Sequence, residues 1–341
     1  MKIEIDIPKT ENKGEDAPPI NISSADGKHC LVGVFDGLGG AGSTMYEEDG
    51  EIHSGAYIAS RIARDTTESF FIEKIKEIDF QISKINLESL KNNIKDALTS
   101  KLKKQKFQQS KLKSALIKTF PTTLAVGYAT FDADKIKIET FWAGDSRVYA
   151  LLPEKGLVQL TKDDLKLDND PYQNIEFDSP LSNLVNLDED FKFNNHSYQI
   201  PCPAILIAAS DGCYGYYSTP MHFEEMILES LRSSNNIEDW KKEISIKLAS
   251  VSGDDCTMAV NFIDTEDKEF FHIKELYRER QEVLYGQFMK EINKIESTVK
   301  ELTSSKDDIL SELKAKEFEK QTKCLEMWNK YKIDNYCEFN K

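Results

Sequence analysis

The sequence has few of the features that build zinc-binding, disulfide-stabilised or membrane-spanning proteins. Its six cysteines include no Cys-x-x-Cys pair and its five histidines are scattered, so a zinc site is not expected. No stretch approaches the roughly 18 uninterrupted apolar residues of a membrane-spanning helix, and the first residues lack the basic-then-apolar plan of a signal peptide. We therefore predict a cytoplasmic protein with reduced thiols and no membrane partner.

Basic residues are also in deficit. The 341 residues contain 44 Lys and Arg against 59 Asp and Glu, which gives a formal net charge of −15. A general nucleic-acid-binding protein needs a basic surface, so we predict no nucleic-acid partner. Most of the negative charge lies in residues 1–264, which matters if some of these carboxylates bind cations.

The fold class follows from how strands and helices are grouped along residues 1–264. Apolar runs rich in β-branched and aromatic residues, bounded by turn residues, predict strands, and those between residues 122 and 160 predict one antiparallel meander. Since strands and helices are grouped instead of alternating, we predict an α+β fold with sheets packed under helices. The expected strands are 30–35, 122–131, 135–142, 147–152, 157–160, 204–209 and 256–263, and the expected helices are 54–75, 87–118, 221–232 and 237–251.

The C-terminal residues show a different pattern. Apolar residues recur at steps of three and four from Tyr285 to Leu302, which predicts a coiled-coil-like heptad seam. A short polar break at 303–305 and a further helix to about Tyr331 predict an antiparallel helical hairpin. We therefore divide the chain into residues 1–264 and a helical extension, 265–341. The hairpin either packs on its own domain or binds a second copy or a partner protein.

Four aspartates stand where predicted strands begin, end or turn. Asp36 and Asp211 each follow a buried apolar strand, Asp254 precedes the last strand, and Asp145 lies in a turn between two strands. For a single Asp-Gly pair the ordinary explanation is a turn residue that caps its own backbone, but four in similar places weaken that explanation. Carboxylates held at the rim of a sheet are suitable ligands for Mg²⁺ or Mn²⁺, which prefer oxygen.

A glycine-rich segment, residues 37–42, matches the G-x-G-x-x-G pattern of dinucleotide-binding folds. However, Asp36 directly precedes it, where its charge would oppose a pyrophosphate. No helix is expected at the third glycine, since residues 43–53 are polar. A tight turn whose glycines let backbone carbonyls face a metal ion is the better interpretation.

Seven short segments, taken in order, resemble the metal-dependent protein phosphatase family, the type 2C serine/threonine phosphatases. The resemblance covers residues 10 to 263 approximately, and the helical extension lies outside it. Each segment is weak alone, but seven in the family's order are difficult to obtain by chance. The segments are 14–17, 34–40, 122–124, 143–147, 159–163, 209–212 and 253–257.

The resemblance implies a four-layer αββα sandwich with two Mg²⁺ or Mn²⁺ ions, and possible room for a third, in a cleft at one end. It implies hydrolysis of phosphoserine and phosphothreonine in proteins by a hydroxide that bridges the metals, without a protein nucleophile. Asp36, Asp211 and Asp254 would be the catalytic set, acting through the metals. The implied metal ligands are Asp36, the Gly37 carbonyl, Asp211 and Asp254, with Glu15 or Asp16 beside Gly37 and Asp145 at the third metal.

Three departures from the family's pattern bear on activity. Leu38 stands where animal-type members have histidine, which favours the bacterial-type subgroup. Glu11 stands where many members have an arginine that grips the substrate phosphate, and Lys9 or Lys13 could replace it only as a point charge. The acidic segment 161–199, with nine acids against three lysines, corresponds to a variable flap and suggests a preference for basic phosphorylation sites.

Two alternatives remain open at this point. One is a weak or inactive pseudophosphatase that serves as a binding or regulatory module, which Glu11 favours mildly. The other is a metal-dependent hydrolase of a different phosphoester. The presence of all the bridging aspartates favours the active phosphatase.

Overall fold

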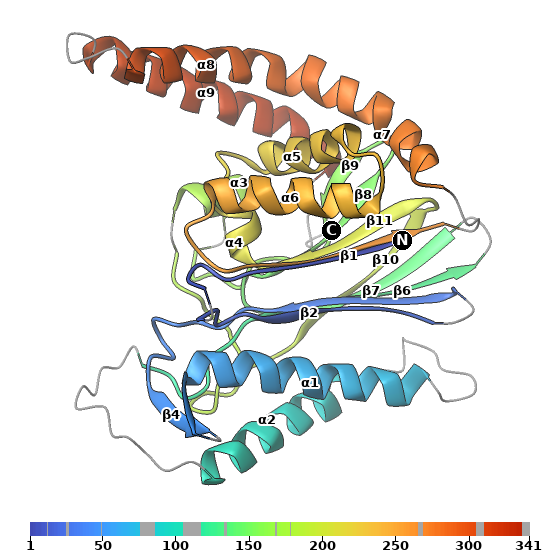
Figure 1. Ribbon diagram of the computed structural model, residues 1–341, viewed down its shortest axis with the longest axis vertical. Coiled ribbons are helices and arrows are strands. Elements are labelled where there is room, and N and C mark those ends of the chain that lie inside the picture. The colour runs from blue at the N-terminus through green and yellow to red at the C-terminus, as the bar shows by residue number, and fades with distance from the viewer. Residues whose placement is uncertain are drawn as a thin grey trace.

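The computed structural model shows two β-sheets packed face to face between layers of helices (Figure 1). It describes residues 1–11, 13–24, 27–48, 50–75, 86–104, 117–132, 135–167, 169–177, 179–264, 269–304 and 310–335. Within these ranges, no helix has the length and apolar character needed to cross a membrane. The α+β, four-layer sandwich is confirmed, and C-terminal helices add a further layer above it.

The strands of the first sheet have the order β10-β7-β6-β3-β2, and those of the second have the order β1-β12-β11-β8-β9. Every neighbouring pair is antiparallel. A small hairpin, β4 with β5, stands apart from both sheets. The strands are β1 (Lys2–Ile7), β2 (Ala17–Ser23), β3 (His29–Phe35), β4 (Met45–Glu48), β5 (Glu51–Ser54), β6 (Leu124–Asp132), β7 (Lys135–Ala143), β8 (Arg147–Leu152), β9 (Gly156–Gln159), β10 (Asn194–Pro201), β11 (Ala204–Ala209) and β12 (Cys256–Ile263).

Helices cover the outer face of each sheet (Figure 1). The helices are α1 (Gly55–Ile75), α2 (Leu87–Lys104), α3 (Pro171–Glu176), α4 (Asp211–Tyr214), α5 (Pro220–Ser233), α6 (Ile237–Val251), α7 (Phe270–Leu284), a π-helical turn (Tyr285–Met289), α8 (Lys290–Ser304) and α9 (Leu310–Asn335). Helices α1 and α2 lie on the first sheet, and α5 and α6 lie on the second.

Side-chain alternation explains why β3 is buried on both faces. Cys30, Val32 and Val34 lie in the core between the two sheets, whereas Leu31 and Phe35 face the core under α1 and α2. Successive residues of a strand point to opposite faces, so a continuous apolar run fits a strand that is covered on both sides. The buried run expected at residues 30–35 is therefore confirmed.

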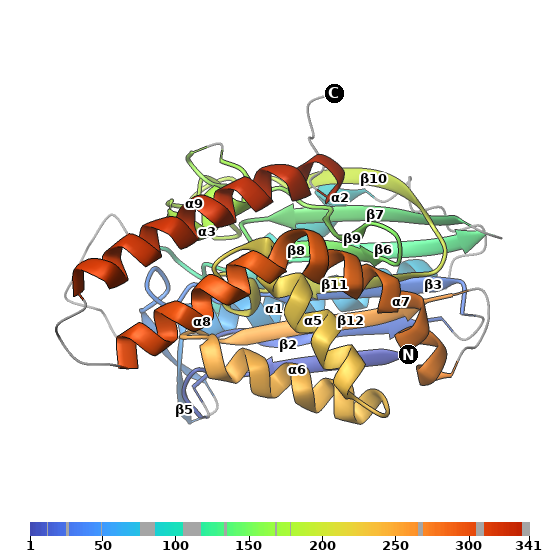
Figure 2. The same cartoon turned by 90° about the horizontal axis from the view of Figure 1, so that it is seen from above.

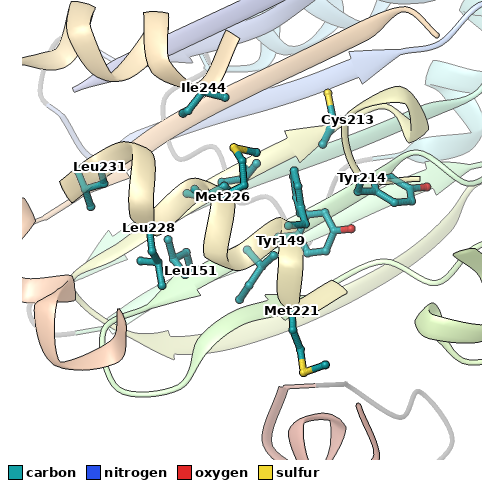
Figure 3. Packing of buried hydrophobic residues seen from close by; sticks show 14 of the residues in the cluster. Tyr149, Leu151, Cys213, Tyr214, Met221, Met226, Leu228, Leu231 and Ile244 are labelled. Carbon is teal, nitrogen blue, oxygen red and sulfur yellow. The ribbon is translucent and has the colours of Figure 1, made fainter. Parts of the chain in front are cut away.

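A third core lies between the second sheet and its helices. Tyr149 and Leu151 of β8 share a buried cluster with Met226 and Leu231 of α5 and with Ile244 of α6 (Figure 3). The apolar faces of the two helices thus cover the outer face of the sheet, as amphipathic helices do.

Local signals set the helix starts. The Ser54 hydroxyl accepts a hydrogen bond from Tyr57 N at 3.1 Å and thereby caps α1. Thr219 caps α5 by accepting from His222 N, and Asn236 caps α6. The helix predicted over 87–118 is shorter: α2 ends at Lys104, residues 105–116 lie outside the described ranges, and residues 117 and 118 are not helical.

The predicted single meander over residues 122–160 is wrong. Strands β6 and β7 pair in one sheet, but β8 pairs with β9 and β11 in the other. The turn between β7 and β8 therefore carries the chain from one sheet to the next. Gly144 in this turn has φ of 113°, and a Cβ there would lie 2.5 Å from the Thr123 Cβ, so a glycine is needed.

Two further regions are more regular than predicted. The segment 161–199 contains α3 and most of β10, which pairs with β7 along its length. Strand β1 pairs with β12, and β4 pairs with β5, although neither β1 nor the β4–β5 hairpin was predicted. The alternation in β1 is short and polar on one face, because that strand forms the edge of its sheet.

The C-terminal helices α8 and α9 lie side by side as an antiparallel pair above α5 and α6 (Figures 1 and 2). The heptad seam that we predicted from Tyr285 is interrupted, because the π-helical turn places the Tyr285 side chain outward at 51% exposure. Residues of α7 and α9, including Tyr277 and Trp328, belong to the same buried cluster as the second sheet. The hairpin packs on its own domain in this chain.

Candidate functional site

The predicted acidic residues lie around one end of the sandwich, where α4 begins (Figure 1). Asp36 directly follows β3, Asp211 is the first residue of α4 after β11, and Asp254 precedes β12. Asp16 directly precedes β2. Together with Glu15 and Gly37, these residues line a cavity of about 1030 Å³. Six of the seven residues predicted to hold metal therefore border a single cavity.

Close backbone packing fixes Asp16 and Asp36 in this cavity. Gly37 N donates to Asp16 Oδ1 at 3.3 Å, and the Thr122 hydroxyl donates to the Asp36 carbonyl at 2.6 Å. A Cβ on Gly37 would lie 2.3 Å from the Glu15 carbonyl oxygen, and one on Gly39 would meet the Glu15 side chain. The glycines of the Asp-Gly-Leu-Gly segment are thus needed so that the chain before β2 can lie against the end of β3.

Asp255 is an organising residue that the sequence reasoning did not identify. Its carboxylate accepts hydrogen bonds from Lys9 N at 2.7 Å, Glu15 N at 2.6 Å and Asp16 N at 3.3 Å. It therefore ties both ends of the loop between β1 and β2 to the start of β12. The adjacent acids Asp254 and Asp255 are the only trace of this in the sequence, and nothing there assigns them separate roles.

Burial and mutual repulsion act on the carboxyl groups of the cavity. Burial, followed by the charges of Asp16 and Asp211, raises the pKa of Asp36 well above its usual range. Burial also raises the pKa of Asp16 to about 7. A hydrogen bond between Asp36 and Asp211 lowers the pKa of Asp211, although burial keeps that pKa above its ordinary value. The raised pKa values mean that these carboxyl groups keep a proton to a higher pH than a free aspartate does.

Asp145 lies in a neighbouring cavity of about 410 Å³, which Asp211 and Asp254 also line. Burial and then the charge of Asp211 raise its pKa well above the ordinary value. A buried ion pair forms another wall: Arg147 Nη2 lies 2.6 Å from Asp163 Oδ2, and Arg147 Nε lies 2.8 Å from Asp163 Oδ1. Arg147 and Asp163 come from two of the quoted segments, but the sequence did not show that they pair.

The donor set fits a hard divalent cation. Asp16 Oδ2 and Asp145 Oδ1 are buried and have no hydrogen-bond partner among the described residues. Unpaired buried carboxylate oxygens are costly, and a cation would satisfy them. In the described ranges, no group of three or more acidic, histidine or cysteine side chains is arranged so that it could hold a metal ion by protein ligands alone. The carboxylates surround the cavity, so water would complete the coordination, as is usual for Mg²⁺.

The position that departs from the family pattern, Glu11, does not line the cavity. Its neighbours Lys9, Thr10 and Lys13 do. The five cysteines within the described residues form no disulfide with one another, and Cys337 lies outside those residues.

Comparison with solved structures identifies the class of fold. The chain has the fold of bacterial serine/threonine phosphatases. It matches a bacterial serine phosphatase with a TM-score of 0.51 at 18% identity, over 79% of this chain and 98% of that one. It matches the serine/threonine phosphatase Stp1 from Staphylococcus aureus with a TM-score of 0.53 at 18% identity, over 77% of this chain and 94% of that one. No model of a known family matches the sequence, and no curated protein matches it.

Proposed function

We propose that the chain is a metal-dependent serine/threonine protein phosphatase of the type 2C family, acting on phosphoserine and phosphothreonine in proteins. One observation carries the proposal: carboxylates from separate strand ends, among them the buried Asp16 with an unpaired oxygen, border one cavity in a fold shared with bacterial serine/threonine phosphatases. Such a constellation has little use in a structural protein, because each carboxylate costs stability where it stands.

The residues that would hold two Mg²⁺ or Mn²⁺ ions are Asp36, the Gly37 carbonyl, Asp211 and Asp254, with Glu15 and Asp16 on the Gly37 side. Asp145, in the adjoining cavity, would serve a third and weaker ion. Bound cations would activate water for attack on phosphorus and neutralise the phosphate oxygens.

The chain's own contribution is orientation. The Glu15 side chain accepts from the Ser54 hydroxyl and lies over Gly39, while Asp255 holds the backbone of Glu15 and Asp16. The Ser210 side chain makes no capping hydrogen bond to α4, but Ser210 N donates to the Thr257 carbonyl at 2.9 Å, which fixes the start of α4 and therefore Asp211. These contacts come from rigid strand ends, which is how a protein aims ligands at one point.

A pseudophosphatase that binds phosphoproteins without turnover is the second candidate. The observations that favour it are that no group of three or more acidic, histidine or cysteine side chains among the described residues is arranged to hold a metal ion, and that a lysine-bearing loop takes the place of the arginine grip. The division at residue 264, the cytoplasmic location, and a homodimer or partner protein bound by the C-terminal helices remain predictions.

The test is hydrolysis of a phosphothreonine peptide by the purified protein with Mn²⁺, with Mg²⁺ and with EDTA, beside Asp211→Asn. We expect phosphate release that requires a metal and that the substitution removes. Ser245→Ala on exposed α6 is the matched control and should retain full activity. A folded protein that releases no phosphate with either metal would establish the binding module instead.

A further inference from the structure

Among the described acids of segment 161–199, only Glu189 lines the cavity, and it forms an ion pair with Lys118. All seven acids of segment 161–199 that the structure describes have partners within the chain. Asp188 accepts from the Thr119 backbone and hydroxyl, Glu189 pairs with Lys118, and Asp190 lies within 3.2 Å of two lysines of α2. The other four are Asp163 with Arg147, Asp164 with Asn183 and Asn194, Asp170 with Lys332, and Glu176 with Tyr172.

Free positive charge, in contrast, borders the cavity. Lys9, Lys13 and Lys166 line it, their side chains are exposed, and none forms an ion pair with any residue that the structure describes. Asp16 and Asp36, which line the same cavity, are only 4% and 8% exposed. Asp16 and Asp36 therefore form its floor, and the three lysines lie at its mouth together with the exposed Asp254 and the Glu189–Lys118 ion pair.

The loop that carries Lys9 and Lys13 is held in place. Asp255 accepts from Lys9 N and Glu15 N, and Lys13 N donates to the Thr10 carbonyl at 2.9 Å. The loop closes on itself, since a Cβ on Gly14 would lie 2.9 Å from the Pro8 Cβ. Two lysines are thus fixed beside the acids before β2.

Lys166 belongs to the flap, which forms a different part of the cavity wall. Its backbone N donates to the Pro180 carbonyl at 2.9 Å, and Ser182 N donates to the Asp164 carbonyl at 2.7 Å. Asp164 is itself held by Asn183 and Asn194 through hydrogen bonds of 2.6 and 2.7 Å. The flap therefore places a free lysine at the cavity and uses its acids to hold its own shape.

We propose that this cavity selects phosphopeptides with acidic residues beside the phosphorylated residue, and that Lys9, Lys13 and Lys166 determine this specificity. The inference rests on the proposed function and names its substrate class. Acidic flanks would meet the exposed ammonium groups at the mouth while the phosphate reaches the floor. It replaces the preference for basic sites suggested by the flap's composition, because composition alone does not show which acids are already paired.

The test compares two phosphothreonine peptides of equal length, one flanked by glutamates and one by lysines, in wild-type protein and in the variants Lys9→Glu, Lys13→Glu and Lys166→Glu. Each reversal should lower kcat/KM for the acidic peptide by about 3- to 5-fold, through KM, as expected for exposed ion pairs. Hydrolysis of p-nitrophenyl phosphate, which has no flanking residues, should change little in Lys166→Glu, because Lys166 is given no part in holding the phosphate. Lys242→Glu on exposed α6 makes the same charge change away from the cavity and should alter neither ratio.

Binding of the same peptides to the Asp211→Asn variant, with the peptides labelled and followed by fluorescence anisotropy with Mg²⁺ present, gives a second readout without turnover. Preference for the acidic peptide that 1 M NaCl removes would support the inference. Equal use of both peptides, or preference for the basic one, would overturn it and leave the phosphatase proposal standing. Failure to hydrolyse any phosphoester would overturn the phosphatase proposal, and the binding ratio would still decide the specificity.

Discussion

Two groups of buried charged side chains lie on different parts of this molecule, and they are built in opposite ways. At the cavity, the charges that act on Asp36 are those of Asp16, Asp211 and Asp145, all of the same sign. Under the C-terminal helices, Glu224 of α5 lies 2.6 Å from Arg280 Nε of α7, with side-chain exposures of 0% and 5%.

The second group is fully compensated by the protein. Arg280 Nη2 donates to Glu224 Oε2 at 3.0 Å, and the Tyr331 hydroxyl of α9 donates to the same carboxylate. Even the neighbouring backbone is fitted to the pair, since a Cβ on Gly156 would lie 2.1 Å from both Arg280 Nε and Glu224 Oε1. Where the chain supplies its own countercharge, as Arg280 does for Glu224, the buried ion pair holds helices together. Where it does not, the buried carboxylates would need a cation from outside, as the proposed function expects.

Breaking the compensated group should have the largest effect on stability. Arg280→Met removes the countercharge and leaves Glu224 buried and unpaired, which typically costs about 3–5 kcal/mol. The free energy of unfolding, measured by urea titration, should fall by that amount.

The double variant Glu224→Gln/Arg280→Met is the matched control. Because it leaves no buried charge, it should recover much of the lost free energy. Activity per folded molecule should stay near wild type in both proteins, since neither residue lines the cavity. A loss below about 1 kcal/mol in the single variant, the range of an exposed pair, would contradict the comparison.

Removing one charge from the acidic residues of the cavity should lower activity and not stability. Asp36→Asn removes one of several repelling carboxylates without a change of volume, so the free energy of unfolding in EDTA should be unchanged or higher. Phosphatase activity should fall by more than about 100-fold, beyond what loss of an outer partner of a metal ligand usually costs. A destabilised protein with retained activity would place Asp36 among the structural residues.

Local sequence patterns were sufficient to predict strands and helices whose burial depends on a single segment of the chain. The strand at residues 256–263 matches β12 at both ends, because its apolar run is buried on both faces. The pairing of β8 could not be predicted, since Gly144 to Ser146 reads as an ordinary hairpin turn although it joins two sheets. The π-helical turn that displaces Tyr285 left no mark in the apolar spacing either.

The residues of the candidate site also fall into those that the sequence predicts and those that it does not. Asp36 and Asp211 could be found because each ends a buried strand, a feature visible within ten residues of sequence. Asp255 could not be separated from Asp254, since its partners Lys9 and Glu15 lie about 240 residues away in the chain. The partners of the flap acids were hidden for the same reason.

Removal of the metal tests the same contrast between the cavity acids and the Glu224–Arg280 pair. Its effect on the free energy of unfolding should be the smallest of those predicted. The pKa of Asp16 is about 7 in the folded protein against an ordinary value of 3.8, so the folded state holds a proton that the unfolded state has lost between these values. In EDTA, the contribution of Asp16 to the free energy of unfolding should therefore be greatest below about pH 4. It should decrease as pH rises to about 7. Mn²⁺ replaces the proton, so at pH 7.5 and ten times its Kd it should add about 1.4 kcal/mol. Urea titrations at pH 5 and pH 7.5, with EDTA or Mn²⁺, measure both effects, and Asp16→Asn should flatten the pH dependence in EDTA.

If the wild-type protein in EDTA showed the same pH dependence as Asp16→Asn and no gain with Mn²⁺, the cavity acids would be compensated after all, and the contrast with Glu224 and Arg280 would disappear.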